Sequence, residues 1–215
     1  MCSSDLPQSG NPRPRLFRLE KDHAVINQMG FNNHGHAAVA SRLNSRTPDG
    51  GIVGVNLGKN KDSSDAAADY ETGATIFSPL ADFLVINISS PNTPGLRTLQ
   101  GQEPLKELLA RTIAARDSVA ASGGHTPILL KIAPDLTDED KSDIARVSID
   151  AGVDGLIISN TTIERPDTLT DPYRVEGGGL SGRPLFEMST RVLSEMYVAT
   201  GGKIPLVGVG GVEDG

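Results

Sequence analysis

The segment VINISSPNTPGLR, residues 85–97, joins a short apolar run to a loop rich in hydroxyl and amide side chains. The run has the length of one buried strand, and two prolines and a glycine punctuate the loop that follows. A hydroxyl between amides at the end of a strand suits proton transfer, but Ser90 or Asn92 could equally cap the next helix. Taken alone, the segment slightly favours capping.

The same pattern recurs along the chain. Short apolar runs at 52–55, 85–88, 128–130, 155–158 and 205–207 each end in small or polar residues. Helical patterns separate or follow them at 63–77, 102–121, 137–151 and 185–200. This alternation is typical of a parallel sheet covered by helices, and in a (β/α)8 barrel the chemistry lies at the carboxyl ends of the strands. Chance capping does not easily explain five such runs.

We therefore predict an α/β fold, a (β/α)8 TIM barrel truncated at both ends. The chain has 215 residues, whereas a complete barrel of this type usually needs about 250. About five strand–helix units are visible. Residues 1–6 (MCSSDL) fit no element, and we interpret them as a non-native leader, similar to the translated end of a sequencing adapter. Residues 7–215 are interpreted as a partial barrel domain.

Composition narrows the classes of function. The 20 basic and 27 acidic side chains give a net charge of −7, which argues against nucleic acid or an anionic membrane surface as a partner of this segment. No run is long and apolar enough to cross a bilayer, and no secretory signal is present. Cys2 is the only cysteine, which argues against disulfides and favours an intracellular chain. Surface or loop positions, without metal-ligand spacing, are expected for His23, His34, His36 and His125.

Residues 87–97 resemble the signature loop of the dihydroorotate dehydrogenases, and of their serine-type, quinone-dependent class in particular. The resemblance covers nearly everything from Pro7 to Gly215. Further matching motifs lie at 10–15, 26–32, 54–60, 131–135, 160–162, 178–182 and 208–211. Each motif is weak alone, but together, in this order and spacing, they are highly specific.

The resemblance implies oxidation of (S)-dihydroorotate to orotate in pyrimidine biosynthesis, with FMN as the hydride acceptor and a membrane quinone as the oxidant. Ser90 would remove the C5 proton. Because a serine has little basicity, it would act through water or a hydrogen-bonded neighbour, for which Thr93 is a candidate. Cysteine-type classes have a thiol at this position, so Ser90 favours the quinone-linked class. Peripheral association with a bacterial or mitochondrial inner membrane is implied for the full-length protein, and a soluble state for this fragment.

The resemblance also assigns binding residues. The substrate positions are Asn27, Gln28, Met29, Gly30, Phe31, Asn87, Asn92, Asn160 and Thr161. An Asn amide donates and accepts hydrogen bonds without adding charge, which suits the carbonyl and N–H groups of the dihydroorotate ring. The flavin positions are Asn56, Asn87, Lys131, Ser159, Gly182 and Gly211. Lys131 would stabilise the anionic reduced flavin rather than extend to solvent, and the glycines would let backbone N–H groups approach the phosphate.

Two alternatives stay open. A related FMN barrel could act on another dihydropyrimidine or pass electrons to fumarate or NAD, although Ser90 and residues 10–15 disfavour it. A non-catalytic half-barrel without flavin is the other alternative. The first and last strands of the family's barrel would lie outside 7–215. We therefore expect this chain by itself to bind FMN poorly and to have negligible turnover.

Overall fold

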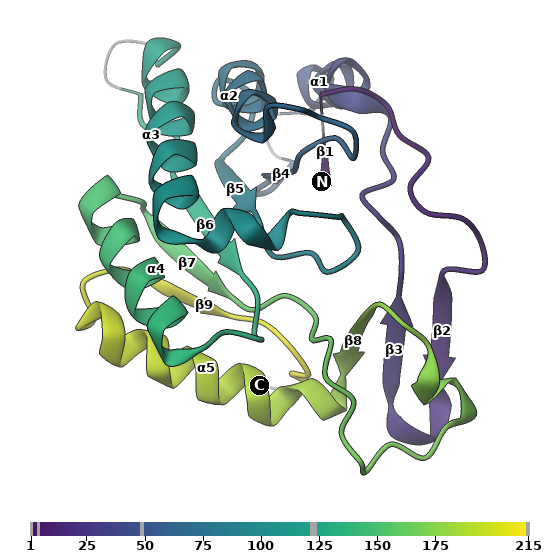
Figure 1. The fold of residues 1–215 in the computed structure, drawn as a ribbon. Coiled ribbons are helices and arrows are strands. Elements are labelled where there is room, and N and C mark those ends of the chain that lie inside the picture. Colours follow the sequence, from purple (N-terminus) through teal and green to yellow (C-terminus); the bar gives the residue numbers. More distant parts are fainter. Residues whose placement is uncertain (1, 4, 48–49, 121–123, 214–215) are drawn as a thin grey trace.

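The structure is a computed structural model that describes residues 2–3, 5–47, 50–120 and 124–213 (Figure 1). A six-stranded sheet with the order β1-β4-β5-β6-β7-β9 forms its centre. The strands are β1 (Cys2–Ser3), β4 (Gly54–Leu57), β5 (Phe83–Asn87), β6 (Ile128–Ile132), β7 (Gly155–Ile158) and β9 (Leu206–Gly208). All neighbouring pairs are parallel, which confirms the predicted truncated (β/α) barrel.

Helices follow the strands and lie along the outside of the sheet (Figure 1). They are α1 (Gly35–Asn44), α2 (Ala66–Phe77), α3 (Gln102–Ser118), α4 (Asp138–Ala151) and α5 (Phe186–Thr200). Side-chain caps explain two of the starts: Asp65 accepts the Ala68 N–H before α2, and Thr137 and Asp140 form a capping box at α4. The four predicted helices are confirmed. However, α3 ends before the predicted limit of 121, a residue outside the described part of the chain.

Alternate side chains of each strand point to opposite faces of the sheet. The face toward the helices supplies the main core, with Leu57, Ile86, Leu130 and Ile158 each at 0% exposure. The opposite face carries polar residues at three strand ends and remains partly open, and Val207 on this face is 43% exposed. The register therefore places the polar groups on the inner face of the partial barrel.

A second, three-stranded antiparallel sheet stands apart from the main one (Figure 1). It contains β2 (Leu16–Leu19), β3 (Ala24–Asn27) and β8 (Gly179–Gly182), in the order β2-β3-β8. Its small core consists of Leu19, Ala24, Ile26, Leu169 and Leu180. Short 3-10 helices complete the chain: η1 (Glu20–Asp22), η2 (Arg97–Gln100), η3 (Pro172–Val175) and η4 (Arg183–Leu185). The sequence pattern did not predict this sheet, which brings Asn27 beside Gly179.

Two local expectations need correction. The first apolar run begins its strand at Gly54, which pairs with Phe83 at the start of β5, rather than at Ile52, which is 83% exposed. His36 is not on the surface: it is 2% exposed and its ring packs edge-on against Phe77 at 5.1 Å. Burial lowers the pKa of His36, and the nearby Asp5 carboxylate partly offsets this effect.

The described residues contain no helix long and apolar enough to cross a membrane. Within those same residues, no cluster of histidine, cysteine, aspartate and glutamate could hold a metal ion. In the segment interpreted as a leader, Cys2 and Ser3 pair with Asn56 and Leu57 of β4. The interpretation of residues 1–6 as non-native stays a prediction.

Candidate functional site

A chain of hydrogen bonds joins polar side chains at the carboxyl ends of three strands. Asn160 Nδ2 donates to Ser89 Oγ at 2.9 Å, and Ser89 Oγ donates to Asn87 Oδ1 at 3.0 Å. Asn87 Nδ2 then donates to Asn56 Oδ1 at 3.1 Å. Three predicted binding residues are thus connected through Ser89, a fully buried hydroxyl to which the sequence analysis gave no role.

Two backbone N–H groups set the direction of this chain. The N–H of Ser89 donates to Asn87 Oδ1 at 3.3 Å, and the N–H of Thr161 donates to Asn160 Oδ1 at 2.7 Å. Because a backbone N–H can only donate, the oxygen and nitrogen of both amides are distinguished. Each amide nitrogen carries two hydrogens, so Asn87 has a second N–H with which to bind a carbonyl or carboxylate, whereas Asn160 Nδ2 also donates to Asn87 Oδ1 at 3.5 Å.

The small sheet brings a second pair of amides to the site. Asn92 Nδ2 donates to Asn27 Oδ1 at 2.9 Å, and Asn27 Nδ2 donates to the Gly179 carbonyl at 3.3 Å. Asn11 supports both partners, since its Nδ2 lies 3.1 Å from the Asn92 carbonyl oxygen and 3.0 Å from that of Gln28. The loop after β5 and the end of β3 therefore meet, and Asn11 is a further supporting residue.

Ser90 lies beside these amides. Its side chain is half-buried, and Oγ accepts the Asn92 N–H at 3.3 Å. Thr93, in the same loop, is 5% exposed, and its Oγ1 has no hydrogen-bond partner among the described residues. A buried hydroxyl without a partner is costly in a folded protein, so such a group is a candidate to bind a ligand, water or a moving proton. The loop therefore contains two hydroxyls available for proton transfer.

Strand β6 supplies a positive charge beside Asn87, and helix α2 supplies a support for its backbone. The ladder pairs Lys131 at the end of β6 directly with Asn87. Below Asn87, the fully buried Tyr70 of α2 donates its hydroxyl to the Asn87 carbonyl at 2.9 Å, and burial raises the pKa of this phenol. Ser159, predicted to contact flavin, is buried, and its Oγ lies 3.0 Å from the Asn160 carbonyl oxygen.

The predicted phosphate glycines lie together at the start of α5. A Cβ on Gly211 would lie 2.7 Å from the Phe186 nitrogen and 2.8 Å from the Gly182 carbonyl oxygen. Ser189 Oγ, in the first turn of α5, lies 2.8 Å from the Gly210 carbonyl oxygen and holds this loop on the helix. No side chain caps the start of α5. Its N–H groups and helix dipole therefore suit an anion such as phosphate.

The remaining predicted substrate residues form the segment between β3 and α1. Gln28 Nε2 donates to the Gly177 carbonyl at 3.0 Å, and Met29 is 37% exposed. The Phe31 ring lies against Gly58 after β4, because a Cβ on Gly58 would meet that ring at 3.2 Å. Gly30 packs beside Asn11. This segment therefore spans from the small sheet to the edge of the main one.

A family model described as dihydroorotate dehydrogenase matches residues 2–215. The chain is 58% identical over 209 residues to a protein of Rhodospirillum rubrum named dihydroorotate dehydrogenase (quinone), covering 97% of the chain and 56% of the relative. A protein of the same name from Bradyrhizobium diazoefficiens is 58% identical, covering 97% of the chain and 58% of the relative.

The solved structures agree with these relatives. A ligand-free DHODH from Eimeria tenella superposes with a TM-score of 0.94 at 43% identity, covering 99% of this chain and 64% of that one. The complex of the same organism's DHODH with ferulenol gives 0.94 at 42% identity, covering 99% and 62%. The chain thus spans a little over half the length of the curated relatives it matches.

Proposed function

The chain belongs to the dihydroorotate dehydrogenase family, and from this membership we propose that the enzyme of which it forms part oxidises (S)-dihydroorotate to orotate in pyrimidine biosynthesis. The observation that carries the proposal is the set of neutral amides held in fixed orientation beside Ser90. The enzyme uses FMN and a membrane quinone. Residues 7–215 are part of its FMN-binding barrel domain.

The amides suit the substrate. Dihydroorotate has a carboxylate and a ring with alternating carbonyl and N–H groups. Asn87 offers an N–H donor, Asn160 is held beside it by hydrogen bonds to Ser89 and Asn87, and Asn27 and Asn92 supply a hydrogen-bonded pair from the small sheet and the loop after β5. Because these groups are uncharged, they can satisfy a neutral ring without placing an unpaired charge in the site.

Ser90 removes the C5 proton of the substrate. The Asn92 N–H already donates to its Oγ, which favours negative charge on that oxygen as the proton leaves. The hydroxyl hydrogen of Ser90 must then move on, either to water or to Thr93, whose Oγ1 has no other partner among the described residues. Thr93 can only relay this proton, because its own hydroxyl hydrogen must in turn pass to water.

The residues present fit FMN. Gly211 packs closely against the Phe186 nitrogen and the Gly182 carbonyl, which brings its backbone to the start of α5, where the N–H groups and helix dipole would suit the phosphate. Asn56, Asn87, Lys131 and Ser159 lie at the strand ends, where the ring and ribityl chain bind. When bound, FMN supplies the acceptor for the hydride that leaves C6. The positive charge of Lys131 favours the reduced, anionic form of the flavin.

The quinone and the membrane belong to the complete enzyme. The names of the relatives from Rhodospirillum and Bradyrhizobium specify quinone as their acceptor. Ser90 in the position of the base supports the same class for this protein. We therefore place the complete enzyme at a membrane surface as a peripheral protein, with the described residues forming part of its barrel.

The test mixes the complete enzyme, purified with its flavin, with dihydroorotate in the absence of oxygen. Loss of the yellow absorbance is expected, and Ser90→Ala should slow it about 10²- to 10⁴-fold. Ser142→Ala, on the exposed face of α4, is the matched control and should be reduced at the wild-type rate. A bound flavin that stays oxidised would refute dihydroorotate as the substrate. Reoxidation by fumarate or NAD rather than quinone would instead indicate a related barrel.

A further inference from the structure

Arg97, the last residue of the signature loop, has contacts that the proposed chemistry does not use. Its Nε donates to the Ser89 carbonyl at 3.0 Å, its Nη1 to Asp135 Oδ2 at 2.7 Å, and its Nη2 to the Thr161 carbonyl at 3.1 Å. Ser89, Asp135 and Thr161 follow β5, β6 and β7, respectively. One guanidinium therefore connects the loops at the ends of three adjacent strands.

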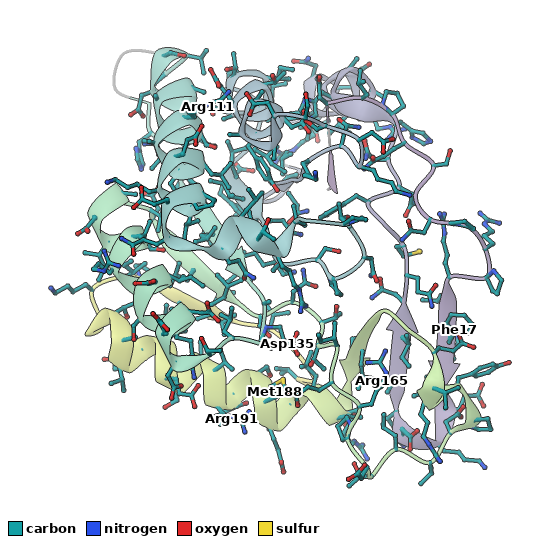
Figure 2. The ribbon with its side chains drawn as sticks, viewed as in Figure 1. Phe17, Arg111, Asp135, Arg165, Met188 and Arg191 are labelled. Atoms are coloured by element: carbon teal, nitrogen blue, oxygen red, sulfur yellow. The ribbon has the colours of Figure 1, made fainter. Side chains whose placement is uncertain are left out.

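Asp135 extends the same connection toward β7. Its carboxylate accepts the Thr162 hydroxyl and, at 3.3 Å, the Ile163 N–H, in addition to Arg97. Figure 2 shows Asp135 between the main sheet and the small sheet. The side chains of Arg97 and Asp135 are only 22% and 11% exposed, so water screens their attraction less than at a surface pair.

The two carbonyl contacts of Arg97 lie next to residues of the proposed site. The carbonyl that Arg97 binds belongs to Ser89, the residue before the proposed base, and the other belongs to Thr161, a proposed substrate residue. We infer that Arg97 and Asp135 are positioning residues, which hold the Ser90 loop at a fixed distance from the substrate groups after β7. This role rests on the proposed function of Ser90.

Only an arginine can make this set of contacts. The guanidinium presents five N–H donors in a rigid plane, so it can bind a carboxylate and two carbonyls in three directions at once. A lysine at position 97 could pair with Asp135 but could not also reach both carbonyls. The arrangement therefore predicts that Arg97→Lys restores only part of what Arg97→Met removes.

The matched control is an ion pair at the other end of β5. Arg46 binds Asp82, directly before β5, with Nη2 3.2 Å from Oδ2 and side-chain exposures of 25% and 46%. Arg46 also donates to the Gly51 carbonyl, so it too connects two loops through its guanidinium. It lies away from the carboxyl ends of the strands. Arg46→Met therefore removes an equivalent contact without touching the proposed site.

The experiment compares the complete flavin-loaded enzyme with its Arg97→Met, Arg97→Lys, Asp135→Asn and Arg46→Met variants. Backbone hydrogen exchange should become at least about tenfold faster in 88–97 and 161–163 for Arg97→Met, and for no other segment. Anaerobic flavin reduction at saturating dihydroorotate should be about 10²-fold slower, as expected when a reacting group is misplaced by about 1 Å. Flavin content should match that of Arg46→Met, whereas the melting temperature should fall further, because Arg97→Met leaves the part-buried Asp135 carboxylate without its partner.

Arg97→Lys and Asp135→Asn should give intermediate exchange and reduction, because each retains part of the network. Unchanged exchange in 88–97, or a reduction rate within about threefold of Arg46→Met, would overturn the inference. If dihydroorotate does not reduce the wild-type enzyme, the proposed function is wrong, but the exchange comparison still decides whether Arg97 orders the loop.

Discussion

The substitution Gly211→Ala tests the phosphate cradle at the start of α5. Gly211 has φ +72°, a left-handed conformation that costs alanine about 1–2 kcal/mol. The added Cβ would also lie 2.7 Å from the Phe186 nitrogen and 2.8 Å from the Gly182 carbonyl oxygen, so the backbone of the cradle must move. If this movement removes one hydrogen bond to the phosphate, binding weakens by about 1.5–3 kcal/mol, or roughly 10- to 150-fold in the dissociation constant of FMN.

Gly201 is the matched control for this experiment. It ends α5 with φ +59°, and a Cβ there would meet nothing within 4 Å. Gly201→Ala should therefore lose a similar 1–2 kcal/mol of unfolding free energy through the backbone alone. It should bind FMN as the wild type does.

The assay has two parts, made on the complete enzyme without flavin. Urea unfolding measures the free energy of unfolding of both variants, and quenching of flavin fluorescence during titration measures the dissociation constant of FMN. Weaker binding is expected for Gly211→Ala only. Equal affinity in the two variants would refute the assignment of the Gly211 backbone to the phosphate.

Three further predictions concern side chains below and around the amides. Tyr70→Phe removes the 2.9 Å hydrogen bond to the Asn87 carbonyl and should lower the free energy of unfolding in urea by about 1–2 kcal/mol. No loss would show that this carbonyl finds another donor. Lys131→Met should slow flavin reduction about 10²-fold in anaerobic stopped-flow measurements. Lys106→Met, on the exposed face of α3, is the control, and equal slowing in it would contradict a specific role of Lys131 in flavin reduction. Burial lowers the pKa of His36 below 6.5, so the unfolded chain binds the extra proton first and stability should fall as the pH drops below 6.5. His36→Leu should show a smaller decrease in unfolding free energy between pH 7.5 and 5.5, and an unchanged decrease would exclude His36 as its source.

Five of the six strands of the main sheet were predictable because each carries its own apolar run, whereas β1 lies in residues that were predicted to fit no element. The runs that became β5, β6 and β7 are strongly apolar, and the Thr137 cap marks the start of α4. By contrast, β8 has the sequence GLSG, which has no alternating apolar pattern. Helix α1 begins without a capping side chain. These elements depend on contacts with distant segments, which no local window contains.

The candidate site shows the same division. The polar strand ends indicated this edge of the sheet, but the roles of Asn87, Ser90 and Asn160 were implied by the family resemblance and stay predictions. The hydrogen bonds that connect the site residues could not be predicted, because Asn160 and Ser89 are 71 residues apart and Asn92 and Asn27 are 65 apart. In the sequence, Ser89 looks like part of a turn. Only the structure shows its hydroxyl between the amides of Asn87 and Asn160. The partner of Arg97 could not be predicted either, because Asp135 lies in the loop after the next strand, β6.

The small sheet has a consequence for the order in which the protein assembles during translation. Asn27 ends the β2–β3 hairpin, and its partner Gly179 lies 152 residues later in the chain. At about 5–20 residues per second, a ribosome needs roughly 8–30 s to make the intervening segment. A two-stranded hairpin is only marginally stable alone, and during this interval the edge of β3 that β8 later covers is open to other strands. The nascent hairpin is thus where we expect chaperones to bind first.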